Sequence, residues 1–182
     1  MSQSLDDRPD SPERLAALIR DVADFPKKGI LFKDITTLLK EPQAFKQSVD
    51  QLTQLVRAHR PEVVIGMESR GFIFAAPIAY KLEAGFVPVR KLGKLPGEVI
   101  STEYDLEYGT NTLELHSDAV RAGQRVLIVD DLLATGGTVS ATIELVERLE
   151  GKVVAVAFLV ELTALNGRER LRDYEVVSLI KF

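Results

Sequence analysis

The fold is decided by residues 126–139, which read Val-Leu-Ile-Val-Asp-Asp-Leu-Leu-Ala-Thr-Gly-Gly-Thr-Val. Four consecutive apolar residues lead into two adjacent acids, Asp130 and Asp131, and a glycine-rich loop then opens an amphipathic helix. An apolar run of this kind predicts a strand that is buried on both faces, as in a parallel sheet covered by helices. The two acids therefore lie at the carboxyl end of the strand, which is where open α/β sheets bind their ligands.

The loop after these acids reads Ala134-Thr135-Gly136-Gly137-Thr138. Backbone N–H groups at the start of a helix lack partners within it, and together with the positive end of the helix dipole they suit a phosphate. A glycine pair alone also fits an ordinary strand-to-helix turn. Beside two carboxylates it predicts a sugar phosphate, with the acids on ribose hydroxyls. Two other phosphate motifs are excluded, because Gly137 stands where a P-loop needs lysine and the fingerprint G-x-G-x-x-G does not occur.

The composition bounds the class of protein. The chain has 182 residues, a formal net charge of −4 and no cysteine, so neither a disulfide framework nor a cysteine-bound metal site is possible. The acidic balance argues against a nucleic-acid or membrane partner, and no apolar run approaches the roughly 20 residues of a membrane span. We expect a disordered N-terminal tail over residues 1–10 and one cytoplasmic domain over residues 11–182.

Local patterns predict strands that alternate with helices. Helices are expected over residues 13–22 with Ser11 as N-cap, from Pro42 onward, over 71–84 with Gly85 as the stop, and over 139–150; strands are expected over 63–65, 86–89, 153–160 and 176–180. Residues 90–111 fit either a long loop or a loosely paired hairpin. This alternation predicts an α/β fold with a doubly wound, mainly parallel central sheet flanked by helices.

Further charged groups follow other predicted strands. Arg70, in the segment Glu68-Ser69-Arg70-Gly71, is placed to hold a second anion such as pyrophosphate, and Lys91 and Lys94 are placed to reach the same anion. A solvated turn and ordinary surface charges are the alternatives. An acid in the segment 103–108 could transfer a proton once the segment closes over a ligand, although a surface carboxylate is more often simply solvated.

Residues 129–138 closely resemble the phosphoribosyl-pyrophosphate (PRPP) motif of the type I phosphoribosyltransferases. Four further segments resemble motifs of the members that use adenine, in the family's order: 25–36, 68–72, 90–97 and 104–109. The resemblance runs from about residue 13 to 182. Members that use 6-oxopurines usually carry an acid where this chain has Ala134, and the adenine members commonly carry arginine where it has Lys33.

The resemblance implies the type I phosphoribosyltransferase fold, with residues 11–40 contributing a small base-binding hood and a flexible loop over the site. It implies transfer of the 5-phosphoribosyl group from PRPP to adenine, giving AMP and pyrophosphate in purine salvage. It also implies a homodimer with no nucleic-acid or membrane partner. The resemblance further implies Mg²⁺ as the cofactor, held by PRPP oxygens and water and not directly by protein side chains.

The same resemblance assigns roles to individual residues. The 5-phosphate is held by Ala134, Thr135, Gly136, Gly137 and Thr138, the ribose hydroxyls by Asp130 and Asp131, the pyrophosphate by Ser69, Arg70 and Lys94, and the base by Leu31, Lys33 and Leu132. Glu107 is the general acid/base, Arg70 and Lys94 assist the departure of pyrophosphate, and Tyr108 joins the substrate-binding set. A cis peptide is expected between Glu68 and Ser69.

Two other functions remain open at this point. A regulator that senses PRPP or a purine would use the same fold for binding, but such regulators carry an additional DNA-binding domain. The nearer alternative is an enzyme that transfers phosphoribose to another base, such as xanthine or orotate. Pyrophosphate release, assayed with PRPP and each base in turn, separates these three functions.

Overall fold

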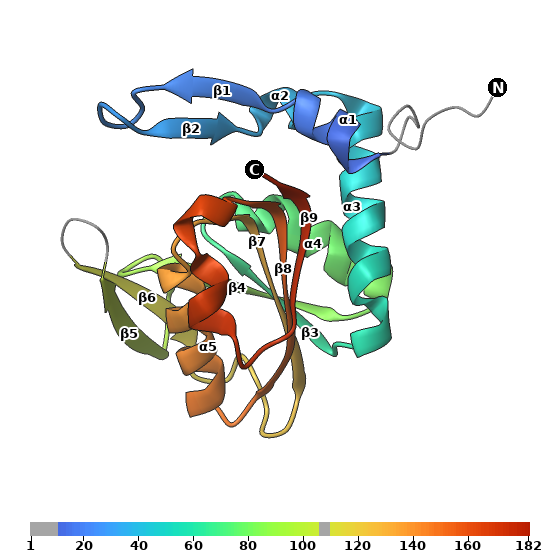
Figure 1. Cartoon of the computed structure of the whole chain (residues 1–182). Coiled ribbons are helices and arrows are strands. Elements are labelled where there is room, and N and C mark those ends of the chain that lie inside the picture. Colours follow the sequence, from blue (N-terminus) through green and yellow to red (C-terminus); the bar gives the residue numbers. More distant parts are fainter. Residues whose placement is uncertain (1–10, 106–109) are drawn as a thin grey trace. The chain divides into compact units, whose positions relative to one another are not determined.

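The computed structural model describes residues 11–105 and 110–182, and the chain forms two compact units that divide after Gln51 (Figure 1). The predicted tail over residues 1–10 lies outside the described residues, as do Glu107 and Tyr108.

The first unit contains helix α1 (Pro12–Ala17), strands β1 (Arg20–Ala23) and β2 (Leu31–Asp34), helix α2 (Thr36–Leu39) and most of helix α3 (Pro42–Val56). Ser11 is the N-cap of α1, as predicted, and its side chain accepts a hydrogen bond from the amide of Arg14 at 3.3 Å.

The prediction of one helix over residues 13–22 was wrong, because this helix ends at Ala17. The residues that follow form β1, which pairs antiparallel with β2 so that Val22 lies opposite Phe32. Pairing between two short segments is a tertiary contact, and it outweighs the local helical pattern of either segment.

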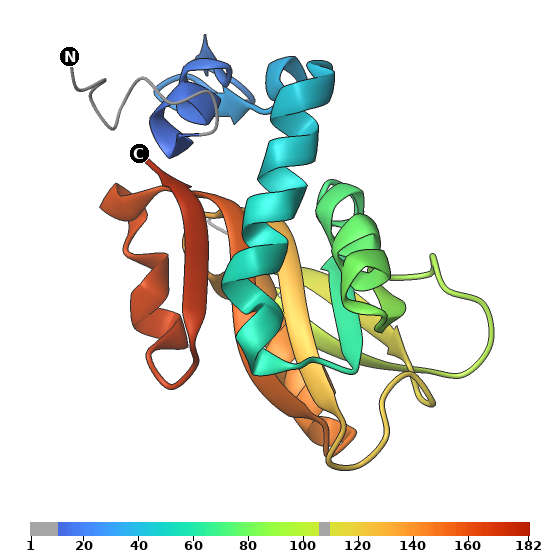
Figure 2. The same cartoon turned by 90° about the vertical axis from the view of Figure 1, so that its right-hand side faces the viewer.

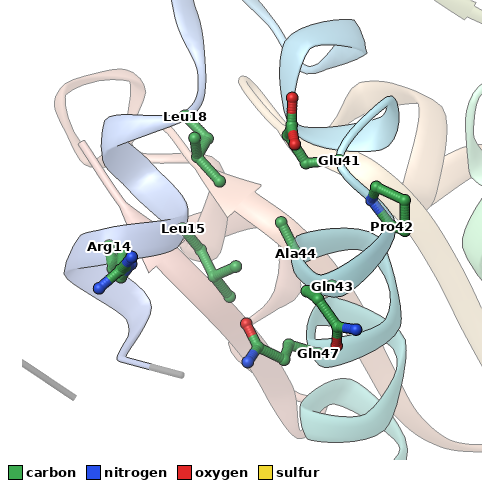
Figure 3. A pocket seen from close by; sticks show the side chains of 8 residues that line it. All are labelled: Arg14, Leu15, Leu18, Glu41, Pro42, Gln43, Ala44 and Gln47. Carbon is green, nitrogen blue, oxygen red and sulfur yellow. The ribbon is translucent and has the colours of Figure 1, made fainter. Parts of the chain in front are cut away.

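A groove of about 510 Å³ lies between α1 and the start of α3 (Figure 3). Leu15 of α1 and Leu18, the C-cap of α1, point toward Ala44 of α3 in this view and contribute to the apolar part of the wall. Its two charged residues, Arg14 and Glu41, are both exposed.

The second unit is built on a sheet of seven strands in the order β5-β6-β4-β3-β7-β8-β9. The strands are β3 (Val63–Met67), β4 (Gly85–Lys91), β5 (Val99–Asp105), β6 (Thr110–His116), β7 (Arg125–Leu133), β8 (Lys152–Glu161) and β9 (Val176–Lys181). Strands β4, β3, β7, β8 and β9 run parallel, and the β5–β6 hairpin is antiparallel at one edge. The predicted doubly wound, mainly parallel sheet is confirmed.

Helices cover both faces of this sheet. Helix α4 (Gly71–Leu82) contacts β3, β4 and β7, and α5 (Gly137–Arg148) contacts β7, β8 and the hairpin from the opposite face (Figures 1 and 2). All five residues of β3 are buried for this reason. The prediction that Gly85 stops this helix was wrong. Helix α4 ends at Leu82, and Glu83 takes the left-handed conformation at its end with φ of 56°.

For residues 90–111 the sequence allowed either a long loop or a hairpin. In the structure this segment contributes to the β5–β6 hairpin. Thr102 of β5 donates a hydrogen bond to Glu144 of α5 at 2.8 Å. Arg148 of α5 donates to the carbonyl of Ser101 at 2.6 Å. The hairpin is therefore fixed at its base to the helix that begins at the glycine-rich loop.

The core of the second unit is aliphatic and centred on β3, β7 and β8. Its fully buried members include Ile65, Ile128, Val156 and Phe158. In the part of the chain that the structure describes, no helix is both long and apolar enough to cross a membrane.

Candidate active site

The carboxyl ends of β3 and β7 lie side by side because the two strands are parallel neighbours. This brings the segment after β3 next to the two acids of β7, as the sequence predicts. A cleft of about 480 Å³ opens there. It is lined by Glu68, Ser69, Arg70, Lys91, Tyr104, Asn111, Asp130, Asp131, Leu132, Ala134 and Thr138.

The two carboxylates occupy different surroundings. The Asp131 side chain is 7% exposed and forms an ion pair with Arg70, with 2.6 Å between Oδ2 and Nε. The Asp130 carboxylate accepts a hydrogen bond from the Asp131 amide at 2.9 Å. Burial raises the pKa of Asp130 well above its usual value, and the neighbouring charge of Asp131 raises it further. Burial also raises the pKa of Asp131, although Arg70 opposes this shift.

A glycine lets the start of α4 approach the two acids. A Cβ atom on Gly71 would lie 2.7 Å from Oδ1 of Asp130 and 3.0 Å from the carbonyl oxygen of Val129. Cβ atoms do not reach such distances, so any other residue at position 71 would displace the end of β7 or the carboxylate. Gly71 thus allows Arg70 and the acids to share one cleft.

The glycine-rich loop forms a second, smaller hollow of about 70 Å³, and several of its residues also line the cleft. Its residues are Asp130, Leu132, Leu133, Ala134, Thr135, Gly136, Gly137, Thr138 and Val139. Gly136 is the N-cap of α5 with φ of +82°, a conformation that favours glycine. The first amides of α5 have no acceptor within the helix, so this hollow offers N–H donors at the positive end of a dipole.

Glu68 connects the segment after β3 to the end of β4. Its carboxylate accepts hydrogen bonds from the Arg90 guanidinium at 3.1 and 3.3 Å and from the Lys91 amide at 3.1 Å. These bonds lower the pKa of Glu68, the Arg90 bond most strongly. The peptide between Glu68 and Ser69 is cis, as the resemblance implies. The carboxylate thereby fixes the backbone that carries Lys91 at the cleft.

The structure brings most of the predicted site residues together. Ser69, Arg70, Asp130, Asp131, Leu132, Ala134 and Thr138 line the cleft, and Thr135, Gly136 and Gly137 line the smaller hollow. Lys94 does not belong to the cleft lining, and Lys91 does. The Lys94 side chain is exposed on the turn after β4.

The predicted base-binding residues Leu31 and Lys33 belong to β2 of the first unit. Leu31 is 51% exposed, which is unusual for a leucine in a strand. The Lys33 ammonium lies 2.7 Å from a carboxylate oxygen of Asp21, and its side chain is only 10% exposed. Both residues remain predictions for base binding, as do the roles of Glu107 and Tyr108.

Sequence reasoning assigned no role to two residues that line the cleft, Tyr104 and Asn111. They are direct cross-strand partners in the β5–β6 hairpin, so their side chains share one face of it. The hairpin that was one of the two alternatives for residues 90–111 could have pointed to them, because the side chains of paired strands alternate between two faces. Choosing the register requires the tertiary structure.

Within residues 11–105 and 110–182, no group of three or more His, Cys, Asp or Glu side chains is placed to hold a metal ion. The cleft does carry two neighbouring carboxylates, Asp130 and Asp131.

A carboxylate pair and a glycine-rich helix start at the carboxyl edge of a parallel sheet are the features of a phosphoribosyltransferase site. A family model described as "Phosphoribosyl transferase domain" matches residues 34–182. The chain belongs to this family.

Individual relatives narrow the assignment. Adenine phosphoribosyltransferase of Alkaliphilus metalliredigens is 60% identical over 168 residues, which are 92% of this chain and 99% of the relative. The crystal structure of the enzyme of that name from Thermoanaerobacter pseudethanolicus has a TM-score of 0.92 and 55% identity, over 94% of this chain and 100% of the other. The Saccharomyces cerevisiae adenine phosphoribosyltransferase, complexed with an imino-altritol bisphosphate and adenine, has a TM-score of 0.89 at 38% identity, over 93% and 98% of the two chains. Within the family, the chain belongs with the adenine phosphoribosyltransferases.

Proposed function

We propose that this protein transfers the 5-phosphoribosyl group of PRPP to adenine, releasing pyrophosphate and forming AMP, and that PRPP binds in the cleft at the ends of β3 and β7. The observation that carries this proposal is the convergence of Asp130, Asp131 and Arg70 on one cleft beside the glycine-rich loop. The relatives named adenine phosphoribosyltransferase match over nearly their whole length, which supports the choice of adenine.

Each part of PRPP has a complementary part of the site. The amides and hydroxyls of residues 134–138 hold the 5-phosphate, because unpaired N–H groups at a helix start bind anions. Asp130 and Asp131 accept hydrogen bonds from the ribose hydroxyls. Ser69 and Arg70 contact the pyrophosphate, together with Lys91 and with Lys94 once the turn after β4 carries it inward.

The reaction breaks the bond between the anomeric carbon and a pyrophosphate oxygen, and the electron pair leaves with pyrophosphate. The anomeric carbon becomes cationic, so the negative charge of the two aspartates stabilises it while Arg70 stabilises the departing anion. N9 of adenine then forms the new bond, and Glu107 takes its proton. Closure of the segment over residues 91–111 excludes water, which would otherwise hydrolyse the activated sugar.

The donor set of the cleft fits Mg²⁺. Carboxylate and hydroxyl oxygens are the ligands it prefers, and it usually keeps several waters and binds substrate phosphates instead of an all-protein cage. Asp130 and Asp131 are the residues that would hold it at this site, indirectly through water and the ribose hydroxyls of PRPP. Bound there, Mg²⁺ supplies positive charge against the developing pyrophosphate.

Adenine is held by Leu31 and Leu132, with its edge read by backbone groups near Leu31 and Lys33. The ion pair between Lys33 and Asp21 supports reading through the backbone, because it engages the ammonium group within the first unit. Lysine in place of the family's usual arginine then changes base affinity little. Ala134 supports adenine over 6-oxopurines, because no acid stands at that position.

The protein acts as a cytoplasmic homodimer. An exposed apolar stripe on α4, formed by Ile73, Ala76 and Tyr80, supports the dimer, since residues three and seven apart lie on one face of a helix. Phe74, next to Ile73 in the sequence, is fully buried and belongs to the core.

Replacing both acids with amides tests the assignment of the site. In the variant Asp130→Asn/Asp131→Asn the shape is kept and the charge is lost. We expect kcat/KM for PRPP to fall at least 100-fold, about 2.7 kcal/mol of transition-state stabilisation. Asp118→Asn, at an exposed turn, is the matched control and should keep full activity.

Pyrophosphate release is measured with adenine, hypoxanthine, guanine, xanthine and orotate in turn. Release with adenine alone is the expected result. Release with another base and not with adenine would reassign the substrate, and PRPP binding without release for any base would make the protein a sensor.

A further inference from the structure

A second glycine, outside every motif discussed so far, lies against the glycine-rich loop. Gly167 begins the short 3-10 helix η4 (Gly167–Leu171) and is buried. A Cβ atom at this position would overlap the carbonyl oxygen of Ala134 and lie 2.9 Å from Cδ1 of Leu133. In the other direction, a Cβ atom on Gly136 would lie 2.8 Å from the carbonyl oxygen of Gly167. The two glycines thus let two backbones meet without intervening side chains.

The segment that carries Gly167 is fixed by its neighbour Arg168. The guanidinium binds both carboxylate oxygens of Glu161, with Nε–Oε1 of 2.6 Å and Nη2–Oε2 of 2.8 Å. It also donates to the carbonyl of Val176 at 2.9 Å and to Oγ of Ser178 at 3.0 Å. A bidentate arginine–carboxylate pair sets an orientation as well as a distance.

Glu161 places this ion pair at the edge of the sheet that carries the site. It ends β8 directly opposite Leu133 of β7, and its side chain is 6% exposed. Burial raises the pKa of Glu161, but the bonds from Arg168 and Ser178 outweigh this and lower the pKa below its usual value. Glu161 is therefore ionised near neutral pH and holds Arg168 across β8, β9 and η4.

We propose that Gly167, held by the Arg168–Glu161 pair, positions the loop that binds the 5-phosphate. The backbone of Gly167 is a rigid support behind Ala134 and Gly136, and it keeps the loop amides aimed at one point. Such preorganised donors bind an anion without the cost of ordering the loop on binding. The role rests on the proposed function, in which residues 134–138 hold the 5-phosphate, and Gly167 and Arg168 are positioning residues that act through that loop.

The test compares a ligand that carries the 5-phosphate with one that lacks it. In Gly167→Ala we expect the Kd for AMP, measured by titration calorimetry, to rise at least tenfold while the Kd for adenosine stays within twofold. The KM for PRPP should rise similarly and the KM for adenine should not. Gly85→Ala is the matched control, because the nearest atom to its Cβ would be Cγ2 of Val63 at an ordinary 3.6 Å, and it should match the wild type.

Arg168→Lys supplies a second variant that keeps the charge and the glycine but loses the bidentate bond. We expect a threefold or greater rise in the Kd for AMP, again without change for adenosine. A folded Gly167→Ala or Arg168→Lys protein with the wild-type Kd for AMP would overturn the role, as would equal losses for AMP and adenosine.

Failure of both variants to fold, with the control intact, would make the contact purely structural and would also overturn the role. If the wild-type protein itself binds AMP no better than adenosine, or forms no AMP, the proposed function fails instead.

Discussion

Asp130 and Asp131 are adjacent in sequence, yet the fold gives them different partners. Asp131 forms an ion pair with Arg70, whereas Asp130 accepts a hydrogen bond from the Asp131 amide and lies beside Gly71. Burial raises the pKa of both carboxyls, and the charge of Asp131 raises that of Asp130 further while Arg70 opposes the shift at Asp131. A cationic or hydroxyl-bearing ligand lowers these pKa values, because it favours the charged form. The close approach of Gly71 to Asp130 and the ion pair between Arg70 and Asp131 thus define one side of the cleft.

The residue-scale prediction concerns Gly71. In Gly71→Ala the added methyl group displaces Asp130 or the start of α4, because it would lie 2.7 Å from the Asp130 carboxylate. We expect the KM for PRPP to rise at least tenfold, equivalent to about 1.4 kcal/mol. Steady-state kinetics at saturating adenine measures this. The Gly85→Ala protein serves as the reference, and wild-type kinetics in Gly71→Ala would show that the approach of α4 to the acids is not needed.

Among the secondary-structure elements, the hairpin of β1 and β2 is the one that sequence patterns misread. It is held by cross-strand pairs between charged residues and by an edge-to-face contact of Phe25 and Phe32 with ring centroids 5.1 Å apart. One of these residues, Asp34, also accepts bonds from the Thr36 amide and hydroxyl at 2.9 and 2.7 Å. The carboxylate therefore joins the end of β2 to α2.

The element-scale prediction is a pH dependence. The bonds from Thr36 and the pairing with Arg20 lower the pKa of Asp34 from 3.8 to about 2. Since the folded pKa lies below the unfolded one, this stabilisation is complete above about pH 4 and is lost as the pH falls toward 2. A carboxyl-carbon NMR titration should give a pKa near 2 for Asp34. A value near 3.8 would mean that these bonds do not form in solution.

For the whole molecule, the family match covers both the sheet and the loops that surround its carboxyl edge, from residue 34 to 182. The surface of the second unit also carries exposed apolar groups on helix α4. Tyr80 is 86% exposed and Ile73 is 36% exposed on the same face of α4. Apolar surface of this kind marks an interaction site when it is contiguous.

The whole-molecule prediction is that α4 lies in the interface of the proposed dimer. Tyr80→Glu places a charge in the stripe, so we expect sedimentation velocity to show a shift from dimer toward monomer, because an unpaired buried charge is costly. Leu165→Glu, at another exposed apolar residue, should leave the dimer intact. A Tyr80→Glu protein that remains dimeric at micromolar concentration would exclude this face as the interface.

How much could be predicted differs between the parts of the molecule. The buried strands and the glycine-rich start of α5 were predicted correctly, because long apolar runs and glycine-rich helix starts carry a strong local signal. The β1–β2 hairpin was not, because four-residue strands are defined by the segment with which they pair. Tyr104 and Asn111 reach the cleft through the register of the β5–β6 hairpin, which is not a local property.

The sequence alone determined the α/β class, the position of the acids at a strand end and the chemistry of a phosphorylated sugar, since each follows from neighbouring residues. Only the tertiary structure decided that Arg70 binds Asp131, that Glu68 holds the end of β4, and that Gly167 lies against Gly136. These contacts join residues from 22 to 61 positions apart, and their existence depends on which strands become neighbours in the sheet.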